Sequence, residues 1–215
     1  MSSRQKLVIL GTRIFAEEVA DLVADGDDFE VVAFGENHER ERCDRPLLGL
    51  PVIWIDDLRP LAASHLAVCA IGTTHRTRFI EQADAMGFRF ATVRHPTARV
   101  SRTSTVGPGS IVSAGAVVAA HTAIGMHVIV NRGVLIGHHT VVGDGVTISP
   151  GANVAGRVTI GPGTYVGIGA IVLDYITVGQ GSVIGAGAVV TKDVPDHVQV
   201  MGMPARITKE GVQGR

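Results

Sequence analysis

Every sixth residue from Val100 to Val190 is valine or isoleucine, and no insertion interrupts the series. The residue four positions after each of these aliphatics is small or β-branched, from Ser104 to Val194, and the residue before that one is often glycine. A period of six fits neither an amphipathic helix nor a strand that simply alternates. Short strands joined by tight turns explain it, because glycine adopts turn conformations that cost other residues energy. The pattern predicts a parallel β-helix whose aliphatic side chains stack about 4.8 Å apart from coil to coil.

The glycines and the aromatic residues divide the chain into two parts. All six phenylalanines and the single tryptophan precede residue 96, whereas 21 of the 27 glycines follow residue 100. Pro96 lies at this change of composition, and such a change is typical of a domain boundary. We therefore expect an α/β domain over residues 1–95 and the β-helix over residues 96–215.

The first part alternates between strand and helix patterns. Apolar runs predict strands at KLVILG (6–11), FEVVAFGE, PVIWI, HLAVCAIG and FRFATV, and apolar residues at helical spacing predict helices over residues 13–25 and 74–86. The segment DDLRPLAAS predicts a short helix, and the charged run from 36 to 45 predicts a solvated loop. This alternation indicates a small Rossmann-like parallel sheet with helices on its faces.

Charge and hydropathy narrow the classes of function. The formal net charge is −1, which offers no basic footprint for nucleic acid. No apolar stretch reaches the roughly 18 residues of a membrane helix, and the N-terminal segment is too short for a signal peptide. Cys43 and Cys69 have neither metal-ligand spacing nor the pattern of a disulfide framework. We expect a cytoplasmic globular protein that does not insert into membranes.

From KLVILG to the closing GMPAR, the chain resembles the hexapeptide-repeat sugar acetyltransferases of the bacillosamine, perosamine and sialic-acid O-acetyltransferase type. The resemblance implies a left-handed β-helix with three faces and eighteen residues per coil. It also implies a homotrimer that uses acetyl-CoA and no metal. The activity it implies is N-acetyl transfer to the amino group of a nucleotide-linked deoxyamino sugar that the α/β domain holds.

Residues eighteen apart would lie one above another in such a coil. His121, His139, Arg157 and Tyr175 then form one column at a corner, and His138 and Gly156 fall in the neighbouring column. In the resembling enzymes the histidine at the position of His138 is the general base, commonly followed by an acidic residue. His139 stands at the place of that acid, so any pairing of the base with a carboxylate inside this dipeptide is in doubt.

The resemblance also assigns the acyl donor and the acceptor to particular residues. Gly156, in the motif VAGRVTIG, matches the segment whose backbone meets the thioester, and Ile168 and Ala186 would follow along the pantetheine groove. Basic residues near the C-terminus, Arg206 and Lys209, could meet the phosphates of coenzyme A. Asn131 matches an asparagine near the acceptor sugar.

Five residues of the first domain follow its strands at their carboxyl ends, where open α/β sheets bind ligands. These candidate acceptor-binding residues are Gly11, Glu36, Gly72, Thr73 and Thr74. The first turn, GTRIFAEEVADL, carries Ile14 and Phe15 where the family has glycine and histidine, and it is not a dinucleotide fingerprint. Whether this domain binds a nucleotide is therefore open at the level of sequence.

Three other functions remain possible from the sequence. The nearest is O-acetylation of a sugar hydroxyl, in sialic acid or a surface polysaccharide, which the altered first turn favours. A zinc enzyme of the γ-carbonic-anhydrase type would need three histidines meeting across a subunit interface, and His121, His127 and His139 share one repeat position. A non-enzymatic scaffold would use the coil for assembly alone.

Overall fold

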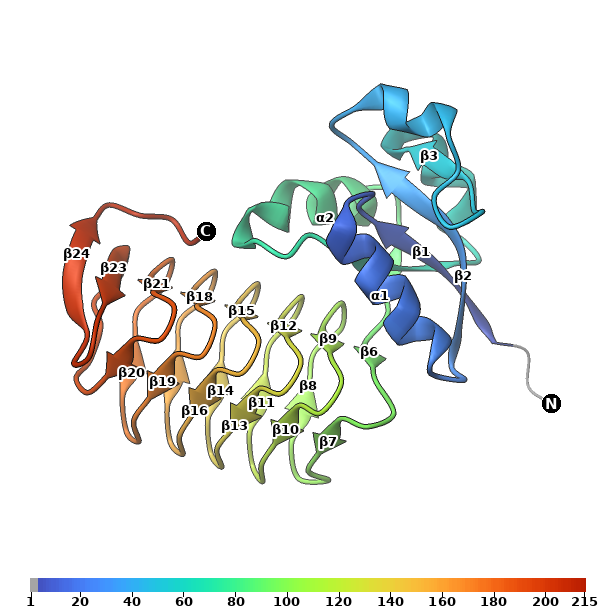
Figure 1. The fold of residues 1–215 in the computed structure, drawn as a ribbon. Helices are drawn as coiled ribbons and strands as arrows, with labels where there is room; N and C mark the ends of the chain where they lie inside the picture. The colour runs from blue at the N-terminus through green and yellow to red at the C-terminus, as the bar shows by residue number, and fades with distance from the viewer. Residues whose placement is uncertain (1–3) are drawn as a thin grey trace. The chain divides into compact units, whose positions relative to one another are not determined.

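The computed structural model describes residues 4–215, which form two compact units (Figure 1). One unit runs up to Gly72 and includes Arg76–Pro96. The other comprises Thr73–His75 and Thr97–Arg215. None of the helices in the described part of the chain is long and apolar enough to cross a bilayer.

The first unit is built on a parallel sheet with the strand order β3-β2-β1-β4-β5. Because β2 and β3 extend the sheet on one side of β1 and β4 and β5 on the other, the connections reverse direction between β1 and β4. Ligands bind outside the carboxyl ends of strands at such a point. The strands are β1 (Gln5–Leu10), β2 (Phe29–Glu36), β3 (Val52–Trp54), β4 (Leu66–Cys69) and β5 (Arg89–Phe90).

Helices cover this sheet because alternate residues of its strands are apolar and buried on both faces. Val8 and Leu10 of β1 belong to a core cluster with Leu58, Phe79 and Phe88. The α-helices of this unit are α1 (Ile14–Ala24) and α2 (Thr77–Asp84), and its 3-10 helices are η1 (Arg40–Asp44) and η2 (Ile55–Leu61). A further 3-10 turn, η3 (Thr74–Arg76), directly precedes α2. The short strand β6 (Val93–Arg94) lies near the end of the unit.

Two expectations for this unit need correction. The charged run 36–45 is not wholly a loop, because Arg40–Asp44 forms η1. The expected helix over residues 74–86 is interrupted, since His75 has non-helical dihedral angles and α2 proper covers only Thr77–Asp84. A turn of 3-10 helix has too few residues to produce the apolar periodicity that sequence patterns depend on.

The second unit is a parallel β-helix with three faces, each a ladder of two-residue strands (Figure 1). Between residues 99 and 190, each strand pairs in parallel with the strand eighteen residues away, so that Val118 lies beside Ile136 and Ile136 beside Val154. Face 1 contains β7 (Arg99–Val100), β10 (Val117–Val118), β13 (Leu135–Ile136), β16 (Asn153–Val154), β19 (Ile171–Val172) and β22 (Val189–Val190).

Faces 2 and 3 follow face 1 in every coil. Face 2 contains β8 (Thr105–Val106), β11 (Ala123–Ile124), β14 (Val141–Val142), β17 (Thr159–Ile160) and β20 (Thr177–Val178). Face 3 contains β9 (Ile111–Val112), β12 (Ile129–Val130), β15 (Thr147–Ile148), β18 (Tyr165–Val166), β21 (Val183–Ile184) and β23 (Val198–Met201), with β24 (Arg206–Glu210) antiparallel to β23. The aliphatics of the six-residue series fill one continuous core, as the sequence predicts.

The corners that join the faces differ in the residues that adopt positive φ. The corner after face 3 uses only glycine there, and the corner after face 2 uses glycine, His127 and His197. The corner after face 1, called corner 1 below, has four non-glycine residues at φ between 58° and 61°: His121, His139, Arg157 and Tyr175. L-residues adopt this region at a cost, and corner 1 differs from the other two corners because none of its left-handed positions is a glycine.

Candidate active site

His138 lies at corner 1, and its imidazole lies against the main chain of the next coil. A Cβ atom built on Gly156 would be 2.9 Å from both Cε1 and Nε2 of His138. Because Gly156 carries no side chain, the ring can lie here, whereas a methyl group at position 156 would displace it. This confirms the expected stacking of positions 138 and 156, and it leaves the Nε2 edge of an exposed imidazole beside a peptide group.

Hydrogen bonds between the two coils fix both turns around His138. The N–H of Arg157 donates to the carbonyl oxygen of His138 at 2.8 Å, and the hydroxyl of Thr140 donates to the carbonyl oxygen of Ala155 at 3.1 Å. Thr140 occupies the small or β-branched position of the repeat and is fully buried. Its hydroxyl satisfies a turn carbonyl that the ladder leaves without a partner, which explains a threonine in an otherwise aliphatic interior.

His139 contacts two other histidines. Its Nδ1 lies 3.1 Å from Nδ1 of His138, and the two rings are nearly perpendicular, at 87°. Its ring centroid lies 4.8 Å from that of His121, one coil earlier. One coil later in the same column, the guanidinium of Arg157 lies over the ring of Tyr175, at 5.6 Å. The column predicted from the eighteen-residue spacing is confirmed.

The pKa of His139 lies below the usual value of an imidazole. Desolvation lowers this pKa first, and the positive charges of His121, Arg157 and His138 lower it further. Each of these effects disfavours the imidazolium, so His139 is neutral at neutral pH.

The other candidate residues of the β-helix lie elsewhere on the coil. Asn131, Ile168 and Ala186 lie at the corner after face 3, across face 1 from corner 1. Asn131 is buried, with its side-chain amide 3.3 Å from the carbonyl oxygen of Ile148, whereas Ile168 and Ala186 are exposed. Arg206 begins β24 and is exposed. The structure therefore brings Gly156 to His138, and it puts Asn131, Ile168 and Ala186 at another corner.

In the first unit, the carboxylate of Glu36 accepts hydrogen bonds from neighbouring groups of the same unit. It accepts hydrogen bonds from the Thr12 hydroxyl and from the N–H groups of Asn37 (2.9 Å), His38 (2.6 Å) and Glu39 (3.1 Å). Burial alone would raise the pKa of Glu36, but these hydrogen bonds outweigh it and hold the pKa below its ordinary value. Glu36 thus shapes the loop after β2 as a buried anion.

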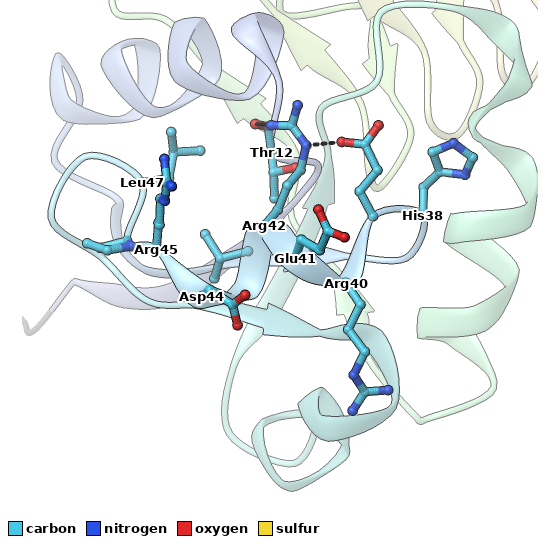
Figure 2. A pocket seen from close by; sticks show the side chains of 11 residues that line it. Thr12, His38, Arg40, Glu41, Arg42, Asp44, Arg45 and Leu47 are labelled. Atoms are coloured by element: carbon cyan, nitrogen blue, oxygen red, sulfur yellow. Dashed lines mark hydrogen bonds and ion pairs between the residues drawn. The ribbon is translucent and has the colours of Figure 1, made fainter.

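That loop lines a cavity of about 900 Å³ at the carboxyl ends of β1 and β2 (Figure 2). The Arg42 guanidinium donates to Glu39 at 2.6 Å and to the carbonyl oxygen of Thr12 at 3.1 Å. Gly11, just before Thr12, has a φ of 131°, and its Cα faces the carbonyl of Ala70. The lining residues are Thr12, His38, Glu39, Arg40, Glu41, Arg42, Asp44, Arg45, Pro46, Leu47 and Val52.

Most of this cavity is lined by the charged run 36–45, which the sequence predicts to be a solvated loop. The run contains an arginine every few residues directly after a buried strand, which is a signal that could have found it. Arg45 forms no ion pair with any residue from 4 to 215, whereas Arg40 lies 3.9 Å from the carboxylate of Asp57 and 5.3 Å from the ring of Trp54. The lining of the cavity thus combines three guanidinium groups with the carboxylates of Glu39, Glu41 and Asp44, and among the arginines Arg45 alone has no ion pair within residues 4–215.

The turn after β4 is divided between the two units. Gly72 belongs to the first unit, whereas Thr73 and Thr74 belong to the second. The Thr74 hydroxyl donates to the main-chain oxygen of Arg215 at 2.9 Å and accepts from its N–H at 2.8 Å. The Arg215 guanidinium lies 5.1 Å from the Tyr165 ring. The side chain of Thr74 is thus engaged in hydrogen bonds with the main chain of Arg215.

Comparison with known proteins identifies the class to which this fold and this corner belong. A family model described as bacterial transferase hexapeptide (six repeats) matches residues 157–192. The acetyltransferase domain of PglB from Neisseria gonorrhoeae FA1090, solved with acetyl coenzyme A, is 34% identical over 95% of this chain and 99% of that one, with a TM-score of 0.87. Among curated proteins, no sequence matches the chain significantly.

Two further solved structures cover nearly the whole chain. PerB from Caulobacter crescentus, in complex with CoA and GDP-perosamine, is 30% identical over 95% of this chain and 97% of that one, with a TM-score of 0.87. WeeI from Acinetobacter baumannii AYE is 28% identical over 94% and 99%, with a TM-score of 0.84.

The chain belongs to the hexapeptide-repeat sugar acetyltransferases that carry an N-terminal α/β domain. Its β-helix is the left-handed one of that family, and the protein is an acyltransferase. The expected resemblance and fold class are confirmed. No group of three His, Cys, Asp or Glu side chains between residues 4 and 215 is arranged to hold a metal ion, and His127 lies at a different corner from His121 and His139.

Proposed function

We propose that this protein is an acetyl-CoA-dependent N-acetyltransferase for the amino group of a nucleotide-linked deoxyamino sugar, with His138 as the general base. The observation that carries the proposal is the position of the His138 imidazole, whose Cε1 and Nε2 lie 2.9 Å from the place that a Cβ atom on Gly156 would take. The reaction needs a base and a backbone donor within one site, and this corner offers both. The ligands of the similar structures, acetyl coenzyme A with PglB and GDP-perosamine with PerB, support the substrates.

The chemistry follows from the needs of a thioester under attack by an amine. The amine nitrogen must lose a proton as it bonds to the carbonyl carbon, and a neutral imidazole with a free ring nitrogen can accept it. The carbonyl oxygen gains negative charge and needs a preorganised donor. The N–H of Gly156 donates to no other residue between 4 and 215, so it is available for this oxygen.

The arginines of the cavity in the first unit support a nucleotide-linked acceptor. Arg40 and Arg45 could meet a diphosphate, because guanidinium groups bind phosphate oxygens in pairs. In this proposal residues 1–95 hold the acceptor, and Gly11 and Glu36 act there by shaping the cavity wall. Residues 96–215 hold acetyl-CoA, with Gly156, Ile168, Ala186 and Arg206 as its contacts.

A sugar hydroxyl is the second candidate acceptor. Ile14, which stands where the family has a glycine, is 84% exposed at the start of α1, so the surface beside the first turn is apolar. Such a surface would change the contacts to a nucleotide-linked amine.

The expected homotrimer remains part of the proposal. Leu135 and Ile171 are exposed apolar residues on face 1, and Val141 is one on face 2. Apolar side chains gathered on flat faces are typical of an interface. Sedimentation analysis should give a mass three times that of the 22.5 kDa chain, and a single-chain mass would contradict the trimer. The expected location is the cytoplasm.

An acceptor panel tests the function. We expect acetyl-CoA and GDP-perosamine, or another nucleotide-linked amino sugar, to release free coenzyme A thiol with kcat/KM about 100-fold above that for the matched hydroxyl sugars. Mass spectrometry of the product should show an added acetyl group on nitrogen. Faster turnover of a hydroxyl acceptor would replace the proposal with O-acetylation. Absence of acetyl-CoA binding by calorimetry would favour a scaffold.

A further inference from the structure

The pair His138–His139 shares one hydrogen bond between two nitrogens of the same kind. The Nδ1 atoms are 3.1 Å apart, which leaves room for one proton between them. Because each neutral imidazole carries its proton on one nitrogen only, the direction of this hydrogen bond determines the tautomer of His138.

The two directions have opposite consequences for a base. If Nδ1 of His138 donates, its Nε2 carries a lone pair and can accept the proton of the substrate. If Nδ1 of His139 donates, the neutral His138 must carry its proton on Nε2, beside Gly156, and cannot act as a base there. A protonated His139 has no acceptor nitrogen and enforces the second, inactive state.

The surroundings of His139 oppose its protonation. The ring of His121 lies tilted against it from the preceding coil, Arg157 follows in the next coil of the same column, and His138 contacts it within the turn. These are the charged or titratable groups that act on His139, and all are cations or potential cations. The pKa of His139 is lowered accordingly, which favours the neutral imidazole, the only form of His139 that has an acceptor nitrogen.

We propose that His139 is a positioning residue: its neutral Nδ1 accepts a hydrogen bond from Nδ1–H of His138, which leaves the Nε2 lone pair of His138 to take the acceptor proton. This inference rests on the proposed function of His138. When the amine nitrogen bonds to the thioester carbon, its proton passes to Nε2, and His139 then holds the Nδ1–H of the imidazolium. The C–S bond breaks, and the thiolate leaving group takes the proton from Nε2.

The proposal predicts an unusual pH profile. Because both His138 and His139 must be neutral, the acid limb of log kcat/KM should steepen to a slope of two as the pH falls, where a lone base gives a slope of one. Replacing His121 with asparagine removes a potential positive charge and part of the desolvation, which raises the pKa of His139. The steep part of the limb should then move to higher pH.

Two substitutions at position 139 separate positioning from structure. His139 has a φ of 59°, which both asparagine and glycine tolerate, so His139→Asn and His139→Gly should both fold. His139→Asn keeps an acceptor oxygen and should retain kcat within a few-fold, with a slope of one. His139→Gly removes the acceptor and should lower kcat on the order of 10- to 100-fold. This loss is smaller than the loss of kcat when a Ser-His-Asp triad loses its carboxylate. The acid limb of the His139→Gly profile should also have a slope of one.

The outcomes distinguish this inference from the proposed function. A wild-type slope of one, together with a His139→Gly profile that superimposes on it, would overturn the positioning role while His138 remained the base. If no acceptor in the panel reacts, the proposed function fails, and NMR titration of histidine Cε1–H resonances still tests the pair. The His139 resonance should then titrate at a higher pH in His121→Asn, and an unchanged titration would reject the coupling.

Discussion

Replacing His138 with asparagine should lower kcat by about 10²–10⁴-fold, the range that a positioned general base contributes. Asparagine keeps polarity and similar size but cannot accept a proton at neutral pH. The contact with Gly156 involves only the far end of the ring, so the coil should stay intact. The rate of thiol release from acetyl-CoA in the presence of the amino-sugar nucleotide measures the effect.

Binding and a matched histidine serve as controls for this loss. The affinity for acetyl-CoA, by calorimetry, should stay within about twofold, because a base contributes to the transition state and little to the ground state. His65→Asn removes a histidine of the first unit whose Nδ1 contacts only the neighbouring Ser64, at 2.8 Å, and should leave kcat unchanged. A His138→Asn enzyme with wild-type kcat would remove His138 from the mechanism.

Replacing Gly137 with alanine should destabilise the β-helix by about 3 kcal/mol or more, at the upper end of the cost of overpacking. A Cβ atom at this position would lie under 3.0 Å from the carbonyl carbon of Ala155 and the nitrogen of Gly156. Both are main-chain atoms of the next coil, so they cannot rotate away. For a chain of this size the loss corresponds to roughly 6–12 °C in Tm, measured by scanning calorimetry or circular dichroism.

Gly133→Ala provides a matched control, because Gly133 and Gly137 flank the same strand, β13. Gly133 has a φ of 66°, and no atom lies within 4 Å of its Cβ position. Alanine there meets only backbone strain of about 1 kcal/mol, or roughly 2–4 °C in Tm. Equal losses for the two variants would show that close approach of the coils is not what requires glycine at position 137.

The sequence predicts the second unit well because its repeat determines the structure directly. An aliphatic residue at every sixth position fixes the inward-facing residue of each strand, and the eighteen-residue coil then fixes which residues pair, as Val118 and Ile136 do. The same spacing predicts the contact of His138 with Gly156. Local pattern and long-range pairing coincide in such a fold.

The remainder of the site depends on side-chain contacts that no pattern carries. The approach of His139 to His138 depends on ring rotation within one turn, and spacing alone does not predict it. The cavity in the first unit forms because Glu36 draws three main-chain N–H groups toward itself and folds the charged run into η1. The hydrogen bond of Thr74 with Arg215 joins residues 141 positions apart, far beyond any local window.

In the proposed mechanism, corner 1 is where this protein gives up stability for activity. Glycine would relieve the left-handed backbone at His121, His139, Arg157 and Tyr175, where each side chain costs about 1 kcal/mol. The corner after face 3 carries no such cost, since glycine fills every one of its left-handed positions. Glycine at corner 1 would therefore stabilise the coil by removing the side chains that the proposed mechanism uses, and a variant selected for heat resistance alone would be expected to lose them first.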